Sequence, residues 1–144
     1  MLLKLLRFAE KQGIIVDYWE FAPPIRAVYL PGDPPVIGLD KHLTRSELRT
    51  YLAEEISHHL VSVGNGIIQP HYSYREKLYV SSLEYRARKL AVNWLLPDKE
   101  FIQAMKKGLA IWELAELFDV TEDAVKFKMN LIRLKTALEG GFGA

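Results

Sequence analysis

Residues 52–60 read LAEEISHHL, a stretch in which two carboxylates and two imidazoles interrupt an otherwise apolar helical run. Such a cluster costs free energy on the buried side of a helix unless a cation or a substrate pairs with it. Glu54 and His58 are four residues apart and therefore project from the same face of a helix. Glu55 precedes His58 by three residues, which is the offset between the general base and the second metal ligand in H-E-x-x-H helices. The stretch thus matches that pattern with Glu54 in place of the first His.

A third candidate ligand, Glu84, lies near the start of the next predicted helix, at about 81–96. One face of that helix carries small or apolar residues after the carboxylate, at steps of three or four: Glu84, Ala87, Ala91 and Leu95. The two alanines permit a close approach to the preceding helix. Catalytic zinc takes imidazole and carboxylate ligands and keeps one position for water. The spacing therefore predicts an ion bound by Glu54, His58 and Glu84. Glu55 would then take a proton from the water. A solvated polar helix face is the alternative.

The composition limits the classes of protein to which the chain can belong. Its 144 residues fit one domain, and 49% hydrophobic and 26% charged residues are ordinary for a globular protein. The net charge of +1 gives no general attraction to nucleic acid or to an anionic membrane. The absence of cysteine excludes disulfides and thiolate metal sites, and it is compatible with the cytoplasmic location that we expect. Charges interrupt the apolar N-terminus, and no uncharged apolar run reaches about 18 residues, so we expect neither an export signal nor a membrane span.

Apolar periodicity and chain breakers predict an α+β fold. Strands are expected at 14–21, 25–30 and 36–39, and helices at 1–12, 44–64, 81–96, 98–106, 111–118 and 122–138. Thr44 and Glu47 match a capping box, and residues 65–78 are expected to form a loop. The strands should form a small antiparallel sheet packed on the helix pair of the metal site. We expect a single domain over 1–144, with a catalytic core at 1–97, a helical part at 98–138 and a frayed tail at 139–144.

Four segments together are typical of a known family. The first is LAEEISHH at 52–59, and in the second Glu84 is followed by alanines and by the stop Leu-Leu-Pro at 95–97. Residues 36–40 (VIGLD) look like the strand before the active helix, and residues 113–121 (ELAELFDVT) look like a trailing helical segment. In these motifs and their order, the chain resembles the ImmA/IrrE family of metallopeptidases, which phages and mobile elements often encode.

The resemblance implies a fold, an activity and a set of site residues. It implies a minimal zincin-like fold and hydrolysis of a peptide bond in a regulatory protein, of which a transcriptional repressor is the expected type. His58 and Glu84 fall on metal-ligand positions of the family, and Glu55 falls on its general base. Glu54 stands where the family has a His ligand. We expect Zn²⁺ as the ion, and a carboxylate ligand makes Mn²⁺ or another divalent ion more acceptable.

Three further side chains are candidates for supporting roles. His59 lies about 100° round the helix from His58, so we expect it to support the site or to lie at the surface, not to bind the ion. His71, in the predicted loop, and Tyr85, next to Glu84, could each stabilise the developing oxyanion, with ordinary packing as the alternative. Basic residues also crowd this region of the chain: Arg75, Lys77, Arg86, Arg88 and Lys89. A solvated helix face is expected for them, and contact with an acidic substrate segment is the alternative.

Two other functions stay open from the sequence. A family member with Glu54 in place of His could be catalytically inactive and act as a protein-binding regulator. Residues 111–135 also resemble a helix-turn-helix, with Ala115, Asp119 and Val125 at its small, turn and hydrophobic positions. A DNA reader needs a basic face, but acidic residues outnumber basic ones between 98 and 139, so nucleic-acid binding is not expected. The apolar residues of this segment are expected to form a core instead: Trp112, Leu114, Leu117, Phe118, Val125, Met129 and Ile132.

Overall fold

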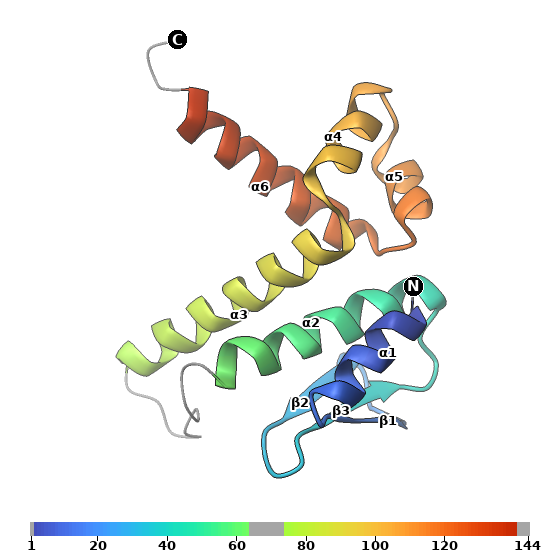
Figure 1. Ribbon diagram of the computed structural model, residues 1–144, viewed down its shortest axis with the longest axis vertical. Helices are drawn as coiled ribbons and strands as arrows, with labels where there is room; N and C mark the ends of the chain where they lie inside the picture. Colours follow the sequence, from blue (N-terminus) through green and yellow to red (C-terminus); the bar gives the residue numbers. More distant parts are fainter. Residues whose placement is uncertain (1, 64–73, 141–144) are drawn as a thin grey trace.

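The order of helices and strands follows the breaks in the sequence. The computed structural model describes residues 2–63 and 74–140. Within those ranges the elements are, in chain order, α1 (Leu2–Lys11), β1 (Ile15–Trp19), β2 (Ala27–Leu30), β3 (Val36–Asp40), α2 (Arg45–Val63), α3 (Tyr74–Leu95), α4 (Asp98–Lys106), α5 (Ile111–Phe118) and α6 (Glu122–Gly140) (Figure 1). The predicted capping box is confirmed: the Thr44 amide donates to Glu47 Oε1 (3.0 Å), and the Glu47 amide donates to Thr44 Oγ1 (3.2 Å). The α+β class is confirmed as well.

The start of α3 differs from the prediction. Residues 74–78, expected to belong to a loop, are helical, and the rest of that expected loop, 65–73, lies outside the described residues. The last glycine or proline before α3 is Pro70, so nothing after it interrupts the helix. Once a helix has formed, each added residue gains a hydrogen bond, which favours extension over a short polar segment such as this one.

The sheet is mixed, not antiparallel as predicted. The strand order is β1-β3-β2, with β2 antiparallel to β3 and β1 parallel to β3. The chain passes from β1 to the far edge of the sheet before it returns, so β3 enters between the two earlier strands and runs in the direction of β1. Gly38 on β3 leaves room for the ring of Trp19 on β1, which a Cβ at that position would overlap. This close approach suits the pairing of the two parallel strands.

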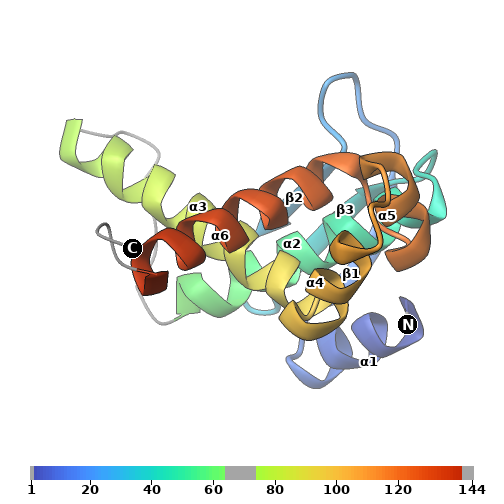
Figure 2. The ribbon, with the colours of Figure 1, turned by 90° about the horizontal axis from the view of Figure 1, so that it is seen from above.

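The central helix is α2, which contacts the sheet, α1 and α3. In Figure 1, α1 and α2 lie beside the sheet, α3 runs antiparallel to α2, and α4 to α6 lie beyond α3. In the view from above, α6 crosses over α3 (Figure 2). The buried core draws on most of these elements, with Leu5 from α1, Ile37 from β3, Ile56 from α2, Val92 from α3 and Val125 from α6. Among the described helices, none combines the length with the apolar content that a membrane crossing requires.

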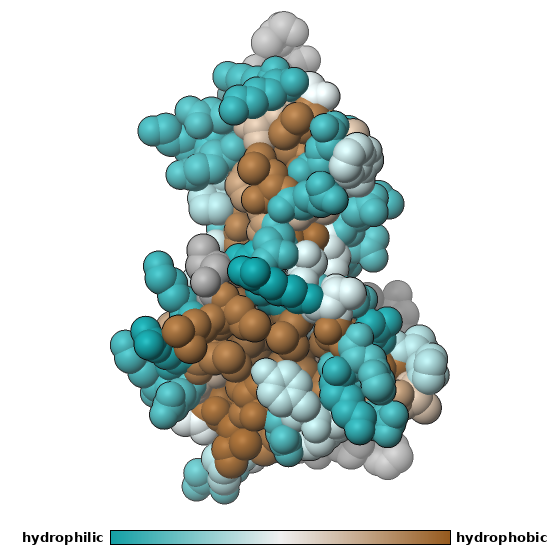
Figure 3. All heavy atoms as spheres, turned by 90° about the vertical axis from the view of Figure 1, so that its right-hand side faces the viewer, coloured by the Kyte–Doolittle hydropathy of each residue, from teal (hydrophilic) through white to brown (hydrophobic). Residues whose placement is uncertain are grey.

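The predicted core of the C-terminal part is correct in most positions and wrong in two. Leu114 and Val125 are buried, whereas Trp112 and Leu117 are 57% and 60% exposed. The short helix α5 buries one face only, which carries Leu114 and Ala115, so the residues on its other face stay in solvent. Hydrophobic side chains also gather on the surface of the half that contains α1, α2 and the sheet (Figure 3).

The turn between α5 and α6 is fixed to the first half of α2. Asp119 forms the turn in the left-handed conformation, with φ 55° and ψ 53°. Arg49 of α2 donates through Nη1 to the carbonyl oxygens of Phe118 (2.6 Å) and Asp119 (2.5 Å). Ser46 donates through its hydroxyl to Asp119 Oδ1 (2.7 Å), and Arg45 Nε lies 3.0 Å from Asp119 Oδ2. These contacts join the C-terminal helices to the helix that carries the site residues.

A buried ammonium group connects α6 to the end of α3 and the start of α4. The Lys128 side chain is 1% exposed, and it donates to Asp98 and to Asn93 Oδ1 (2.8 Å). Lys135 donates to the second oxygen of Asp98 (3.1 Å). These hydrogen bonds hold the pKa of the Asp98 carboxyl below its ordinary value. The carboxylate therefore stabilises the fold in its ionised form.

We expect Asp98→Asn to destabilise the fold near neutral pH and to have less effect in acid. Because the folded-state pKa of Asp98 is depressed, its contribution to the free energy of unfolding is present above the unfolded pKa of about 3.9 and is lost as the pH falls through the folded value. Urea unfolding at about pH 7 and about pH 3 should show that the difference between wild type and variant narrows in acid. The exposed Asp33→Asn is the control, and a constant difference for Asp98→Asn would contradict the prediction.

Candidate metal centre

One face of α2 turns its polar residues toward β2, α3 and α6. Four half-buried residues share this face at steps of four or three: Glu47, Tyr51, Glu54 and His58. Glu47 accepts a hydrogen bond from Arg26, just before β2 (3.0 Å), and Glu54 lies beside Arg88 of α3. The negative charge of Asp123, in the first turn of α6, also acts on Glu54. The polar face therefore lies where three elements of the fold meet.

The next helix brings Glu84 opposite His58. Since α2 and α3 pack side by side and run antiparallel (Figure 1), later residues of α2 face earlier residues of α3. Glu54 lies one turn before His58, and Arg88 lies one turn after Glu84. Arg88 Nε is 3.9 Å from Glu54 Oε1, and the charge of Glu84 favours the protonated form of His58. The two helices thus present two facing pairs, Glu54 with Arg88 and His58 with Glu84.

Burial and repulsion between carboxylates oppose ionisation on this face of α2. Burial, together with the charges of Glu54 and Glu84, raises the pKa of Glu55 to about 7. Burial also raises the pKa of Glu54, against the lowering effect of the Arg88 charge. Burial lowers the pKa of His58, although Glu84 acts in the opposite direction. The neutral imidazole, whose lone pair a metal requires, is therefore favoured, and the carboxylates concentrate negative charge that a cation would offset.

The donor types around His58 fit a divalent metal, but they are not gathered into one group. Imidazole nitrogen and carboxylate oxygen are both zinc ligands. Among the side chains that the structure describes, no three His, Asp or Glu residues lie close enough together to hold an ion. Glu54 is engaged by Arg88 instead. The ligand set Glu54, His58 and Glu84 stays a prediction, as does the role of Glu55.

Arg88 departs from the solvated helix face expected of it. Its guanidinium carbon lies 4.8 Å from the centre of the Phe127 ring on α6, and the Tyr85 ring lies 5.6 Å from the same ring. Sequence reasoning did not place Arg88, Phe127 or Asp123 at the site. The four-residue step from Glu84 to Arg88 was a usable signal for one of them. No local pattern indicates the other two, which come from a helix distant in the chain.

His59 ties α2 to the edge strand of the sheet. Its side chain is buried, with Nδ1 2.8 Å from the Tyr29 hydroxyl and the two rings in a T-shaped arrangement. It does not lie at the surface, and its contact with Tyr29 holds β2 alongside α2. Tyr85 is 46% exposed against Phe127, and a role in stabilising the oxyanion stays a prediction. His71 lies outside the described residues.

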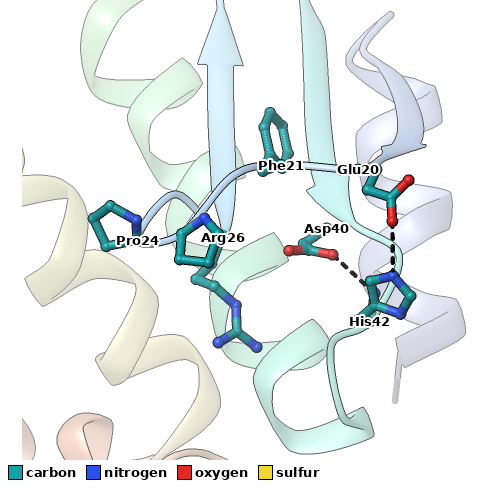
Figure 4. A pocket seen from close by; sticks show the side chains of 7 residues that line it. Glu20, Phe21, Pro24, Arg26, Asp40 and His42 are labelled. Carbon is teal, nitrogen blue, oxygen red and sulfur yellow. Dashed lines mark hydrogen bonds and ion pairs between the residues drawn. The ribbon is translucent and has the colours of Figure 1, made fainter.

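A separate pocket lies where the loop after β1 enters β2. Its volume is about 520 Å³, and its lining residues are Glu20, Phe21, Pro23, Pro24, Arg26, Asp40 and His42 (Figure 4). His42 Nε2 lies 3.3 Å from Glu20 Oε1, and the His42 amide donates to Asp40 Oδ1 (2.9 Å). Of the predicted site residues that the structure describes, none lines this pocket. Glu20 and Asp40 pair with His42 within this pocket, whereas Arg26 pairs with Glu47 at the start of α2.

Comparison with known proteins gives one family and one similar structure. The model of a family described as IrrE N-terminal-like domain, Peptidase_M78, matches residues 9–130. Among solved structures, a Mycobacterium tuberculosis transcriptional regulator aligns with a TM-score of 0.63 at 18% sequence identity, over 88% of this chain and 40% of that chain. This likeness shows the fold alone, and the chain spans less than half the length of that regulator. Comparison with curated protein sequences gives no significant match.

Proposed function

Because the chain belongs to the IrrE N-terminal-like (Peptidase_M78) family of metallopeptidases, we propose that it is a metal-dependent endopeptidase that hydrolyses a peptide bond in a regulatory protein of the repressor type. One observation carries the proposal beyond family membership: the charge of Glu84 on α3 reaches both His58 and Glu55 on α2. A family of this kind uses a divalent metal, and we propose Zn²⁺, with Mn²⁺ as the alternative.

The side chains divide the chemistry among them. His58, Glu84 and Glu54 would hold the ion. A divalent ion bound there would polarise the carbonyl group of the scissile bond and lower the pKa of a water molecule. Glu55 lies one residue from Glu54 on α2 and would take the proton from the attacking water. It would then deliver that proton to the leaving amine, so that the same side chain acts first as base and then as acid.

The edge strand β2 suits a substrate in extended conformation. It pairs with β3 on one side, and no other strand of the described residues pairs with its free edge. The hydrogen bond between Tyr29 and His59 holds this strand beside α2. A peptide added to the free edge would form main-chain hydrogen bonds with β2 and would run along the polar face of α2.

Metal content tests the proposal directly. Protein purified without added metal should contain about one Zn²⁺ per chain by elemental analysis. His58→Ala and Glu84→Ala should each weaken zinc binding at least about tenfold, because each removes a ligand. His42→Ala, in the separate pocket, is the matched control and should retain the wild-type content. Equal zinc in His58→Ala and wild type, or none in either, would contradict the proposed site.

A catalytically inactive, protein-binding regulator is the second candidate. It is favoured by the engagement of Glu54 with Arg88 and by the lack of a three-residue metal group among the described side chains. DNA binding through 111–135 has less support. The helix that would enter a DNA groove, α6, begins with Glu122 and Asp123, whose charges would repel phosphates.

A further inference from the structure

The guanidinium of Arg88 is held between two helices beside the candidate metal centre. Nε lies 3.9 Å from Glu54 Oε1 on α2, and Cζ lies 4.8 Å from the centre of the Phe127 ring on α6. The Nε atom is buried and makes no hydrogen bond within the described part of the chain. The cation is therefore close to a carboxylate that it does not fully bind, in a position that an aromatic ring maintains.

The charges around His58 give this cation a role beyond packing. Glu54 lies one turn before His58 on α2, and the charge of Glu84 on α3 acts on both His58 and Glu55. Glu54 and Glu55 are half-buried. Among the described residues, the ion pair of Arg88 is with Glu54, and its charge acts to lower the pKa of that carboxyl. An ion that binds Glu54 would meet a carboxylate that already faces a cation.

We propose that Arg88 is a positioning residue that holds Glu54 in the metal-free protein and competes with the divalent ion for its carboxylate. The inference rests on the proposed function. When the ion binds, it replaces Arg88 as the positive partner of Glu54. The affinity for the ion is therefore lower than it would be with the same three ligands and no Arg88. Stacking on Phe127 keeps the planar guanidinium beside the site after it releases Glu54.

Zinc affinity tests this competition. In competition with a chromophoric chelator, Arg88→Gln should bind Zn²⁺ about tenfold more tightly than wild type, because it removes a positive charge next to a ligand. Arg86→Gln removes the same charge from an exposed position on the same helix, and it should change the affinity by less than about twofold. Arg88→Lys keeps the charge and should stay within about threefold of wild type. Arg88 is half-exposed, so its replacement is not expected to prevent folding.

Two further measurements distinguish competition from packing. Without metal, the melting temperature of Arg88→Gln should be lower than that of wild type, and saturating Zn²⁺ should remove this difference. A packing role would lower the melting temperature of the variant equally with and without Zn²⁺. In a Glu54→Gln background, Arg88→Gln should raise zinc affinity by much less than it does in the wild-type background. Unchanged or weaker zinc binding by Arg88→Gln alone overturns the inference and leaves the proposed peptidase standing. Absence of zinc binding from both wild type and Arg88→Gln overturns both.

Discussion

Glu55→Gln is expected to bind zinc as wild type does and to hydrolyse peptide bonds about 1,000-fold more slowly. The amide keeps the size and hydrogen-bonding capacity of the carboxyl group but cannot accept a proton from water. His58 and Glu84 are unaltered in this variant, so the predicted ligands from both helices stay in place. The assay would follow cleavage of a quenched fluorogenic peptide library, with zinc content measured on the same preparations.

The control for this experiment is Glu100→Gln, which makes the same chemical change at an exposed carboxylate on α4, outside the site. It should cleave at the wild-type rate. Near-normal cleavage by Glu55→Gln would show that another group acts as the base. Loss of zinc from Glu55→Gln would show instead that Glu55 is a metal ligand. Its assignment as the general base would then be wrong, whereas the proposal of a metal site would stand.

Arg49→Ala is expected to lower the free energy of unfolding by about 3 kcal/mol, which corresponds to a fall in melting temperature of about 10 °C. The Arg49 side chain is 4% exposed and donates to the carbonyl oxygens of Phe118 and Asp119. Alanine leaves both part-buried carbonyls of the turn without this donor, and each unsatisfied buried group costs about 1–3 kcal/mol. Urea or thermal unfolding measures the loss.

Arg45→Ala provides a matched control on the same helix. Arg45 also pairs with Asp119, at 3.0 Å, but its side chain is 73% exposed. A solvent-exposed ion pair contributes about 0.2–1 kcal/mol, so its loss should be several times smaller. Equal effects of the two substitutions would show that the charge of Asp119, and not the two backbone carbonyls, determines the role of Arg49.

Local signals in the sequence were reliable where one segment decides its own structure. The reciprocal bonds of Thr44 and Glu47 and the left-handed Gly13 after α1 appear where the sequence indicated helix ends. The predicted antiparallel direction of β1 relative to β3 was wrong. Short turns favour antiparallel pairing only where strands that follow each other in the chain are also neighbours in the sheet. Here β3 enters between β1 and β2, an order that no single turn determines.

In the site, too, some features could be predicted from the sequence and others depend on how the helices pack. The four-residue step from Glu54 to His58 places both on one face of α2, and the sequence alone predicted this. The partner of Glu54 could not be predicted in the same way. Arg88 reaches Glu54 because α3 packs antiparallel to α2, and Phe127 holds Arg88 because α6 packs on α3.

The sequence by itself determined which helix carries the chemical groups, where that helix begins, and which family the chain resembles. Those features depend on neighbours within a few residues, whose conformational preferences act before the chain is compact. Only the tertiary structure decided that β1 lies parallel to β3, that Arg49 is buried against the α5–α6 turn, and that Glu54 faces a cation. Each of these depends on contacts between distant segments, and their free energy exists only once the helices have packed.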